Sequence, residues 1–211
     1  MSETPSAARA AIFDRIKKAN SSVQTGSPIT DYAAIPREYQ QSASMDRAAI
    51  LNIFAERLRE YDARVYHASP ATVAEAIGTL LAEHGQQSAL VANAFPEEWR
   101  PEGFDWRTEA DVDVDAMEKA EGAVVTCEVA IAHTGTIVLK DARRLTLLPD
   151  RLLCVVREGQ VVETVPEAFG RLQAFAAEAL TFVSGPSATA DIEMTRIRGV
   201  HGPRFLDVVL V

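Results

Sequence analysis

The side chains best suited to chemistry lie near the carboxyl end of the chain, in the segment 181–193. Residues 181–183 are β-branched and aromatic, which predicts a buried strand, and Gly and Pro then end it. Because loops leaving the carboxyl ends of strands in an open α/β sheet bind ligands, this segment is a candidate ligand site. The same residue types also form ordinary turns and helix caps. The candidate ligand-binding residues are Ser184, Gly185, Ser187, Thr189, Asp191 and Glu193.

A second polar group follows an apolar run at 123–127. Glu128 stands where that run ends, and a carboxylate there either pairs with a cation or has a raised pKa suited to acid–base or nucleophilic work. The pairing alternative would join it to Arg143 or Arg144. Further on, Thr134, Gly135 and Thr136 can offer two hydroxyls and a free backbone amide to an anion, although such turns are common.

His201 lies in a second turn, between Gly199 and Pro203. A loop histidine either shuttles protons near neutral pH or holds the loop through hydrogen bonds. We take Glu128 and His201 as the candidate catalytic residues. Five arginines flank the two polar segments and can bind a carboxylate or phosphate, or neutralise nearby acids: Arg143, Arg144, Arg196, Arg198 and Arg204.

These residues form a site only if the fold brings the two segments together. We expect one concavity at one edge of a sheet, lined by Glu128, Thr136, Ser187, Asp191 and His201.

Helices and apolar strands alternate along the chain, which predicts an α/β fold with a mainly parallel sheet. Residues 46–61 and a segment opening at Ser69 and Pro70 show helical periodicity, and a last helix is expected at 166–180. Strands are expected at 88–92, 123–127, 137–139 and 152–156, the last turning through 158–159 into a hairpin with 161–162. We expect an amino-terminal helix and extended arm over residues 1–45 and the α/β domain over residues 46–211.

The composition excludes several classes of function. A net charge of −9 argues against nucleic acid and against an anionic membrane surface as partners. Two cysteines cannot build a Cys₄ cluster site, and neither a dinucleotide fingerprint, a P-loop, a zinc motif nor a hydrolase elbow is present. Residues 1–9 lack the apolar core of a signal peptide, and no stretch is long and apolar enough for a membrane span, so we expect a cytoplasmic protein.

Several sequence blocks together resemble the LUD-domain family, and within it the lactate utilization protein C branch. The blocks are Glu128, residues 132–139, residues 148–149, residues 184–187, Thr189, residues 191–193 and residues 199–203. The family often has an acidic residue before its Thr-Gly-Thr, whereas this chain has His133, so a role for that acid does not carry over.

The resemblance implies a three-layer α/β sandwich like that of ribose-5-phosphate isomerase, glucosamine-6-phosphate deaminase and the coenzyme A transferases. It also implies work in the oxidation of L-lactate to pyruvate, with no cofactor in this chain and iron–sulfur clusters on partner proteins of the lactate utilization system. Three alternatives remain open. The chain is a subunit with a pocket for a small carboxylate or phosphate, a non-catalytic assembly or regulatory protein, or a transferase or isomerase acting on coenzyme A or sugar phosphates.

Overall fold

A computed structural model describes residues 7–21, 32, 34–140, 143–189, 197–199 and 201–211. The chain divides into two compact units, Met1–Tyr39 and Gln40–Val211. The first unit contains helix α1 (Ala7–Asn20), and the second contains the sheets. Among the described residues, every helix is too short or too polar to span a lipid bilayer.

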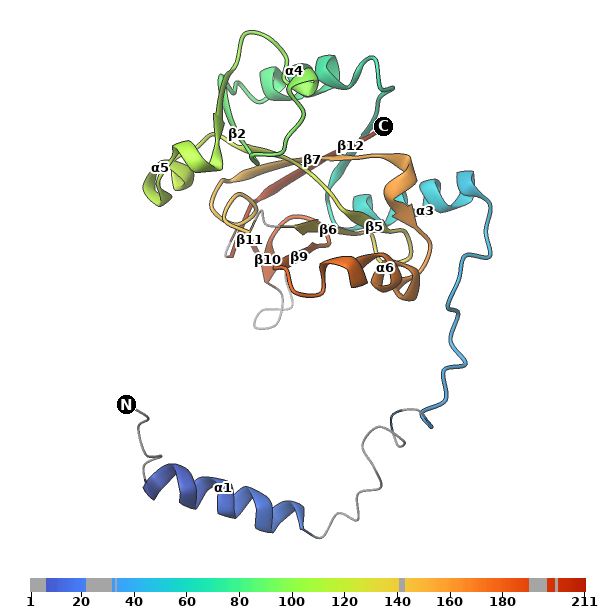
Figure 1. The fold of residues 1–211 in the computed structure, drawn as a ribbon. Helices are drawn as coiled ribbons and strands as arrows, with labels where there is room; N and C mark the ends of the chain where they lie inside the picture. The colour runs from blue at the N-terminus through green and yellow to red at the C-terminus, as the bar shows by residue number, and fades with distance from the viewer. Residues whose placement is uncertain (1–6, 22–31, 33, 141–142, 190–196, 200) are drawn as a thin grey trace. The chain divides into compact units, whose positions relative to one another are not determined.

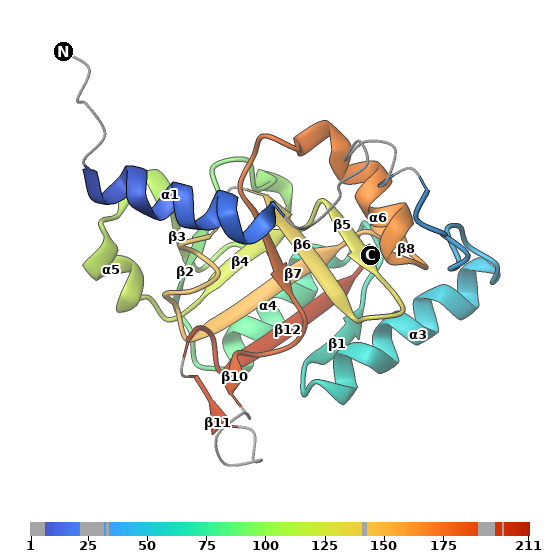
Figure 2. The same cartoon turned by 90° about the horizontal axis from the view of Figure 1, so that it is seen from below.

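The centre of the second unit is a six-stranded sheet in the order β1-β12-β7-β4-β2-β3, in which every neighbouring pair is parallel. Its central strands are continuous apolar runs because both of their faces are covered. Figures 1 and 2 show β7 and β12 running side by side through the middle of the unit. The bounds are β1 (Arg64–His67), β2 (Ser88–Val91), β3 (Asp105–Thr108), β4 (Ala123–Thr126), β7 (Arg151–Val156) and β12 (Phe205–Leu210).

A smaller sheet, in the order β8-β5-β6-β9, was not anticipated from the sequence. Its strand β8 pairs with β5 in parallel, whereas β7 belongs to the large sheet, so the predicted hairpin between them is wrong. The link between β7 and β8 crosses from one sheet to the other. The bounds are β5 (Val129–Ile131), β6 (Thr136–Lys140), β8 (Val161–Val162) and β9 (Leu180–Val183), and a separate pair is formed by β10 (Ala188–Thr189) and β11 (Ile197–Arg198).

Helices cover both sheets. In the view of Figure 1, α4 (Val73–Glu83) lies above the large sheet, and the small sheet and α6 (Val165–Leu172) lie below it. Alternate residues of β7 show the layering, because Leu153 packs in the core under α4 while Cys154 packs in the core shared with α3 (Arg47–Glu60) and the small sheet. Short elements complete the unit: α5 (Val114–Glu118), η1 (Glu97–Trp99), η2 (Glu109–Asp111), η3 (Glu158–Gln160) and η4 (Gln173–Phe175).

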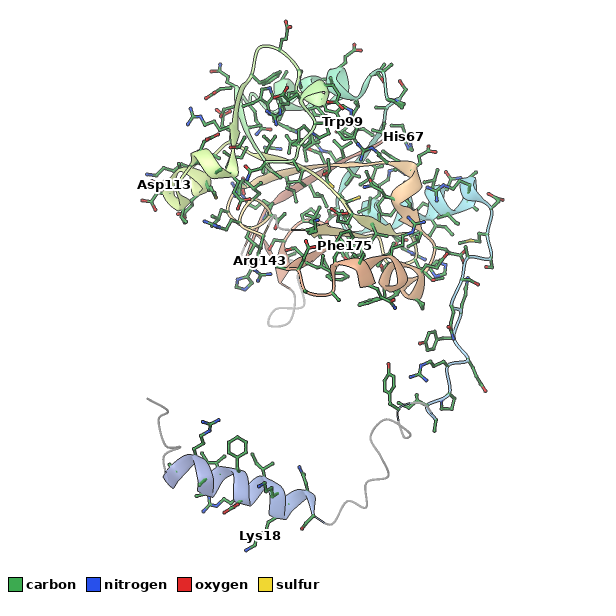
Figure 3. All side chains as sticks on the ribbon, viewed as in Figure 1. Lys18, His67, Trp99, Asp113, Arg143 and Phe175 are labelled. Carbon is green, nitrogen blue, oxygen red and sulfur yellow. The ribbon has the colours of Figure 1, made fainter. Side chains whose placement is uncertain are left out.

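The predicted α/β class with a mainly parallel sheet is confirmed. Helix α3 begins where expected, because the Asp46 side chain caps it by accepting from the Ala49 amide at 2.8 Å. The last helix is shorter than predicted and ends at Leu172. After it, Phe175 lies against the outer side of the small sheet (Figure 3). Phe182 of β9 is 47% exposed because β9 is an edge strand, which corrects the expectation of a buried one.

Candidate functional site

The Thr-Gly-Thr turn and the Ser184 loop meet at a chain of three hydroxyls. Thr134 Oγ1 lies 2.7 Å from Thr136 Oγ1, which lies 2.7 Å from Ser184 Oγ. The strand register produces this contact. Ile137 of β6 pairs with Val183 of the antiparallel strand β9, so Thr136, just before Ile137, lies opposite Ser184, just after Val183. Thr136 is buried and the outer two residues are exposed. Each hydroxyl both donates and accepts, so the ends of the chain can bind a ligand's polar atoms.

Two glycines seat these turns on the carboxyl end of α3. Gly135 has φ +59°, and a Cβ there would lie 2.8 Å from Arg57 Cβ. Gly185 has φ +89°, and a Cβ there would lie 2.5 Å from Tyr61 Cβ, at the helix cap. Left-handed backbone and close approach both require glycine. The expected free amide is wrong for Gly135, because its N–H donates to Ala132 O at 3.3 Å to close the β5–β6 turn.

Ser187 joins the Ser184 loop to the turn that contains His201. The Ser187 amide donates to Pro203 O at 2.8 Å, and the Gly199 amide donates to Ser187 O at 3.0 Å. The His201 amide donates to Ser187 Oγ at 3.3 Å. Backbone hydrogen bonds therefore hold both carboxyl-terminal turns together, and the imidazole of His201 stays exposed.

Below these turns lies a cavity of about 180 Å³. Its walls come from β9, from the ends of β7 and β12, and from the turns before them. Most lining side chains are apolar, and the polar ones carry hydroxyls or an imidazole. The described lining residues are Thr146, Leu147, Leu152, Thr181, Phe182, Val183, Ser184, Gly185, Pro186, Ser187, His201, Gly202, Pro203 and Leu206.

The cavity lies at the amino ends of strands β7 and β12 of the large sheet, whereas the sequence predicted a site at the carboxyl ends of strands. The Ser184 loop leaves β9, a strand of the small sheet, and not a strand of the parallel sheet. Leu152 and Leu206, which line the cavity, are near the amino ends of β7 and β12. The carboxyl-end rule for open α/β sheets therefore does not account for this cavity.

Glu128 is not among the residues that line the cavity. It is half-buried just before β5, and its amide donates to Val138 O at 2.9 Å. Because Ile131 pairs with Thr136 at the other end of β5, Glu128 stands about three residues, or about 10 Å, from the hydroxyl chain. Its expected partner Arg144 instead approaches Glu109, with Nε 3.7 Å from Oε1.

The other candidates divide between described and undescribed positions. Thr189 is in β10, which pairs with β11, while Asp191, Glu193 and Arg196 lie outside the described residues. Arg204 donates to both oxygens of Asp150, at 2.6 and 2.7 Å, and these bonds lower the pKa of Asp150. Arg204 therefore neutralises a nearby acid, which is the second of the two roles considered for these arginines. Arg143 is exposed and is labelled in Figure 3.

Sequence reasoning missed Glu163, a carboxylate that is only 1% exposed. Its Oε2 accepts from the amides of Ser44 at 2.7 Å and Met45 at 3.0 Å. Its Oε1 accepts from Ser44 Oγ at 3.2 Å and from the side-chain amide of Gln40. The last residues of the arm therefore wrap a buried charge.

The hydrogen bond from the Met45 amide, with those from Ser44 and Gln40, lowers the pKa of Glu163 from its ordinary 4.5 to about 2. His133 lies beside it, with Nε2 3.6 Å from Oε1, so the residue before the Thr-Gly-Thr turn faces a fixed negative charge. One local signal was available, since Glu163 directly precedes the capping box of α6 formed by Thr164 and Glu167. The burial itself depends on residues more than a hundred positions away.

Taken together, the described residues form a cavity lined by hydroxyl groups and one imidazole. Of the residues expected in one concavity, Ser187 and His201 line this cavity, whereas Glu128 and Thr136 do not. Within the described part of the chain, no group of three or more His, Cys, Asp or Glu side chains could hold a metal ion.

Known proteins resemble this chain over most of its length. The family model described as LUD domain matches residues 2–211. Lactate utilization protein C of Deinococcus radiodurans is 39% identical over 181 residues, which cover 82% of this chain and 84% of that protein. Lactate utilization protein C of Bacillus pumilus is 26% identical over 191 residues, or 79% of this chain and 80% of that protein.

A solved structure shares the fold. The crystal structure of a DUF162 family protein from Deinococcus radiodurans has a TM-score of 0.69 to this chain at 32% identity. The match covers 80% of this chain and 99% of that one.

Proposed function

The chain belongs to the LUD domain family, and on that premise we propose that it serves in lactate utilization, in the oxidation of L-lactate to pyruvate. It works beside partner proteins that carry the iron–sulfur clusters. The names of its curated relatives support the role in lactate utilization. The division of labour is supported by the two cysteines of this chain, which are too few for a Cys₄ cluster.

The finer part of the proposal is a pocket for a small carboxylate or phosphate in the cavity below the Ser184 loop. The observation that carries it is that Ser184 and Ser187 from one turn and His201 from the next all line one cavity. A volume of about 180 Å³ is below the range of about 300–1,000 Å³ that drug-sized ligands occupy. The size therefore favours a molecule of a few heavy atoms over a whole coenzyme A.

The polar groups suit recognition of an oxyanion. Hydroxyls of Ser184 and Ser187 can donate to carboxylate oxygens, and a protonated His201 would add a charge-assisted donor. The apolar walls, Leu147 and Phe182 among them, would contact the carbon skeleton. Binding by these groups orients a ligand and does not by itself supply an acid–base pair.

A thermal-shift titration of the isolated protein with L-lactate, pyruvate, ribose 5-phosphate and coenzyme A tests the pocket. L-Lactate or pyruvate should raise Tm in a saturable way, because a ligand that binds only the folded state stabilises it. Leu147→Trp should abolish that rise, since Leu147 lines the cavity and is 37% exposed, so a larger ring can enter it without being forced into the core.

Val114→Trp is the matched control, because Val114 is 48% exposed in α5 and does not line the cavity. It should leave the ligand-dependent rise intact. A rise that survives Leu147→Trp, or the lack of any rise with L-lactate and pyruvate, would exclude this cavity as their site.

One observation favours a second function, that of a non-catalytic assembly or regulatory component. Glu128 is absent from the cavity that His201 lines, so the two candidate catalytic residues do not share one ligand there. This alternative expects no ligand-dependent rise in Tm and stabilisation only by the partner proteins. Turnover of any of the four compounds by the isolated chain would exclude it.

A further inference from the structure

A second cavity, of about 260 Å³, opens at the end of the large sheet where its parallel strands begin. Neighbouring parallel strands begin at the same end of a sheet, so their first residues lie close together. Here these are Arg64 of β1, Arg151 of β7 and Phe205 of β12. The register places Phe205 opposite Arg151 and Arg64 opposite Asp207. The described lining residues are Asp62, Arg64, His84, Arg151, Phe205 and Leu206.

Most of the charge at this edge is already paired. Arg64 donates to Asp207 through Nε at 2.8 Å and Nη2 at 3.1 Å, and His84 Nε2 lies 3.1 Å from Asp207 Oδ2. Asp207 is 3% exposed, so this cation and this imidazole serve to hold a buried carboxylate. Asp150, next to Arg151 in the chain, is bound by Arg204.

Arg151 differs from these residues. Its Nη1 is buried and has no hydrogen-bond partner among the described residues. Its guanidinium carbon lies 4.1 Å from the centre of the Phe205 ring, but a ring face does not satisfy N–H donors as an oxygen does. A buried cationic donor without an acceptor is costly, so the position of the guanidinium is not explained by contacts within the described chain.

A second described donor that lacks an acceptor belongs to Gln86, which does not line the cavity. Gln86 is 8% exposed and its Nε2 has no partner among the described residues. A Cβ at Gly122 would touch Gln86 Nε2 and lie 3.3 Å from Arg151 Cβ, so Gln86 lies near the start of β7 and not at the guanidinium. Arg151 Nη1 is a nitrogen donor, so the group that would satisfy it is an acceptor.

We propose that the cavity binds a small oxyanion, a carboxylate or a phosphate, through the guanidinium of Arg151. An anion in the cavity attracts the guanidinium and gives Nη1 the acceptor that it lacks among the described residues. Asp62, which also lines the cavity, opposes ligands of high charge. This site is independent of the proposed lactate pocket, although Leu206 lines both cavities.

Calorimetric titration of the full chain with inorganic phosphate and, separately, with acetate tests the proposal and distinguishes the two ligand types. At least one of them should bind saturably, and Arg151→Met should weaken that binding by about tenfold or more. Without the anion, Arg151→Met should keep or raise Tm, because it removes a buried donor that has no partner. A purely structural arginine would instead lower Tm when replaced.

Arg157→Met is the matched control. Arg157 follows the same strand at its other end, its guanidinium lies 4.5 Å from the centre of the Trp99 ring, and it does not line the cavity. Anion binding should be unchanged in this variant. If Arg151→Met does not fold, Arg151→Gln provides the same comparison. Absence of saturable binding of both anions, or binding equally tight in the Arg151 variant, would overturn the proposal.

Discussion

The hydroxyl of Thr136 lies 2.7 Å from the hydroxyl of Ser184, a residue 48 positions further along the chain. The contact joins the β5–β6 turn to the loop after β9, and through Ser187 to the carboxyl-terminal turn. It is therefore the point at which the two polar segments of the sequence meet.

Thr136→Val should lower the free energy of unfolding by about 1 kcal/mol, because it removes the central hydroxyl of the chain. In a double-mutant cycle with Ser184→Ala, the coupling energy should be about 0.5–1 kcal/mol. Urea unfolding measures both values. The control partner is Ser88, whose hydroxyl bonds to Glu121 at 3.3 Å, and its cycle with Thr136 should show no coupling. Equal coupling in the two cycles would contradict a direct contact.

Gly185→Ala and Gly135→Ala should each cost about 2 kcal/mol or more of stability, since both positions combine positive φ with a neighbour in the way of a Cβ. The comparison is Gly170→Ala, inside α6, where a Cβ meets nothing within 4 Å. That change should stabilise the protein by about 0.5–1 kcal/mol. Chemical denaturation of the three variants ranks their free energies of unfolding. If Gly185→Ala leaves the free energy of unfolding unchanged, the loop does not pack on α3.

Glu163 should make stability depend on pH in the acid range. Its pKa is about 2 in the folded chain, against an ordinary value of 4.5, so the folded state holds fewer protons than the unfolded state between these values. The stabilising contribution is thus complete above about pH 5 and is lost as pH falls toward 2. Glu163→Gln should lower Tm at pH 7, and the difference from the wild type should shrink across that window.

Glu158→Gln is the control for this measurement, because Glu158 is exposed just after β7. The Tm of the Glu158→Gln variant should equal that of the wild type at every pH. A Glu163→Gln variant whose deficit stays constant from pH 7 to about pH 2 would show that hydrogen-bond geometry, and not ionisation, makes the difference.

Cys154 should be unreactive in the folded protein. Burial raises the pKa of its thiol well above the ordinary value, and the thiolate is the species that reacts with disulfide reagents. A colorimetric thiol assay at pH 8 should find both cysteines buried and slow, and should count two fast thiols in urea. Rapid labelling of Cys154 in the native state would indicate that β7 opens locally.

Local pattern determined much of the fold. Continuous apolar runs such as β4 and β7 predicted a parallel sheet, because only a strand covered on both faces can be apolar throughout. Asp46 marked the start of α3 for an equally local reason, since its side chain satisfies an amide three residues away. Strands were expected at the positions of β6, β8 and β9, but their pairing into a separate sheet was not, because a short apolar run does not indicate its partner strand.

The site itself needed the tertiary structure. The sequence by itself marked Ser184, Ser187 and His201 as able to bind a ligand or transfer protons. It brought Glu128 into the same hypothesis from its position at the end of an apolar run and from the family resemblance. Only the pairing of β5, β6 and β9 decided that Thr136 meets Ser184 while Glu128 stands at the far end of β5. Likewise, only long-range packing sets Glu163 under the arm and leaves Nη1 of Arg151 without an acceptor among the described residues. Side-chain type is a local property, whereas the partner of a side chain depends on strand register and on segments that no local pattern relates.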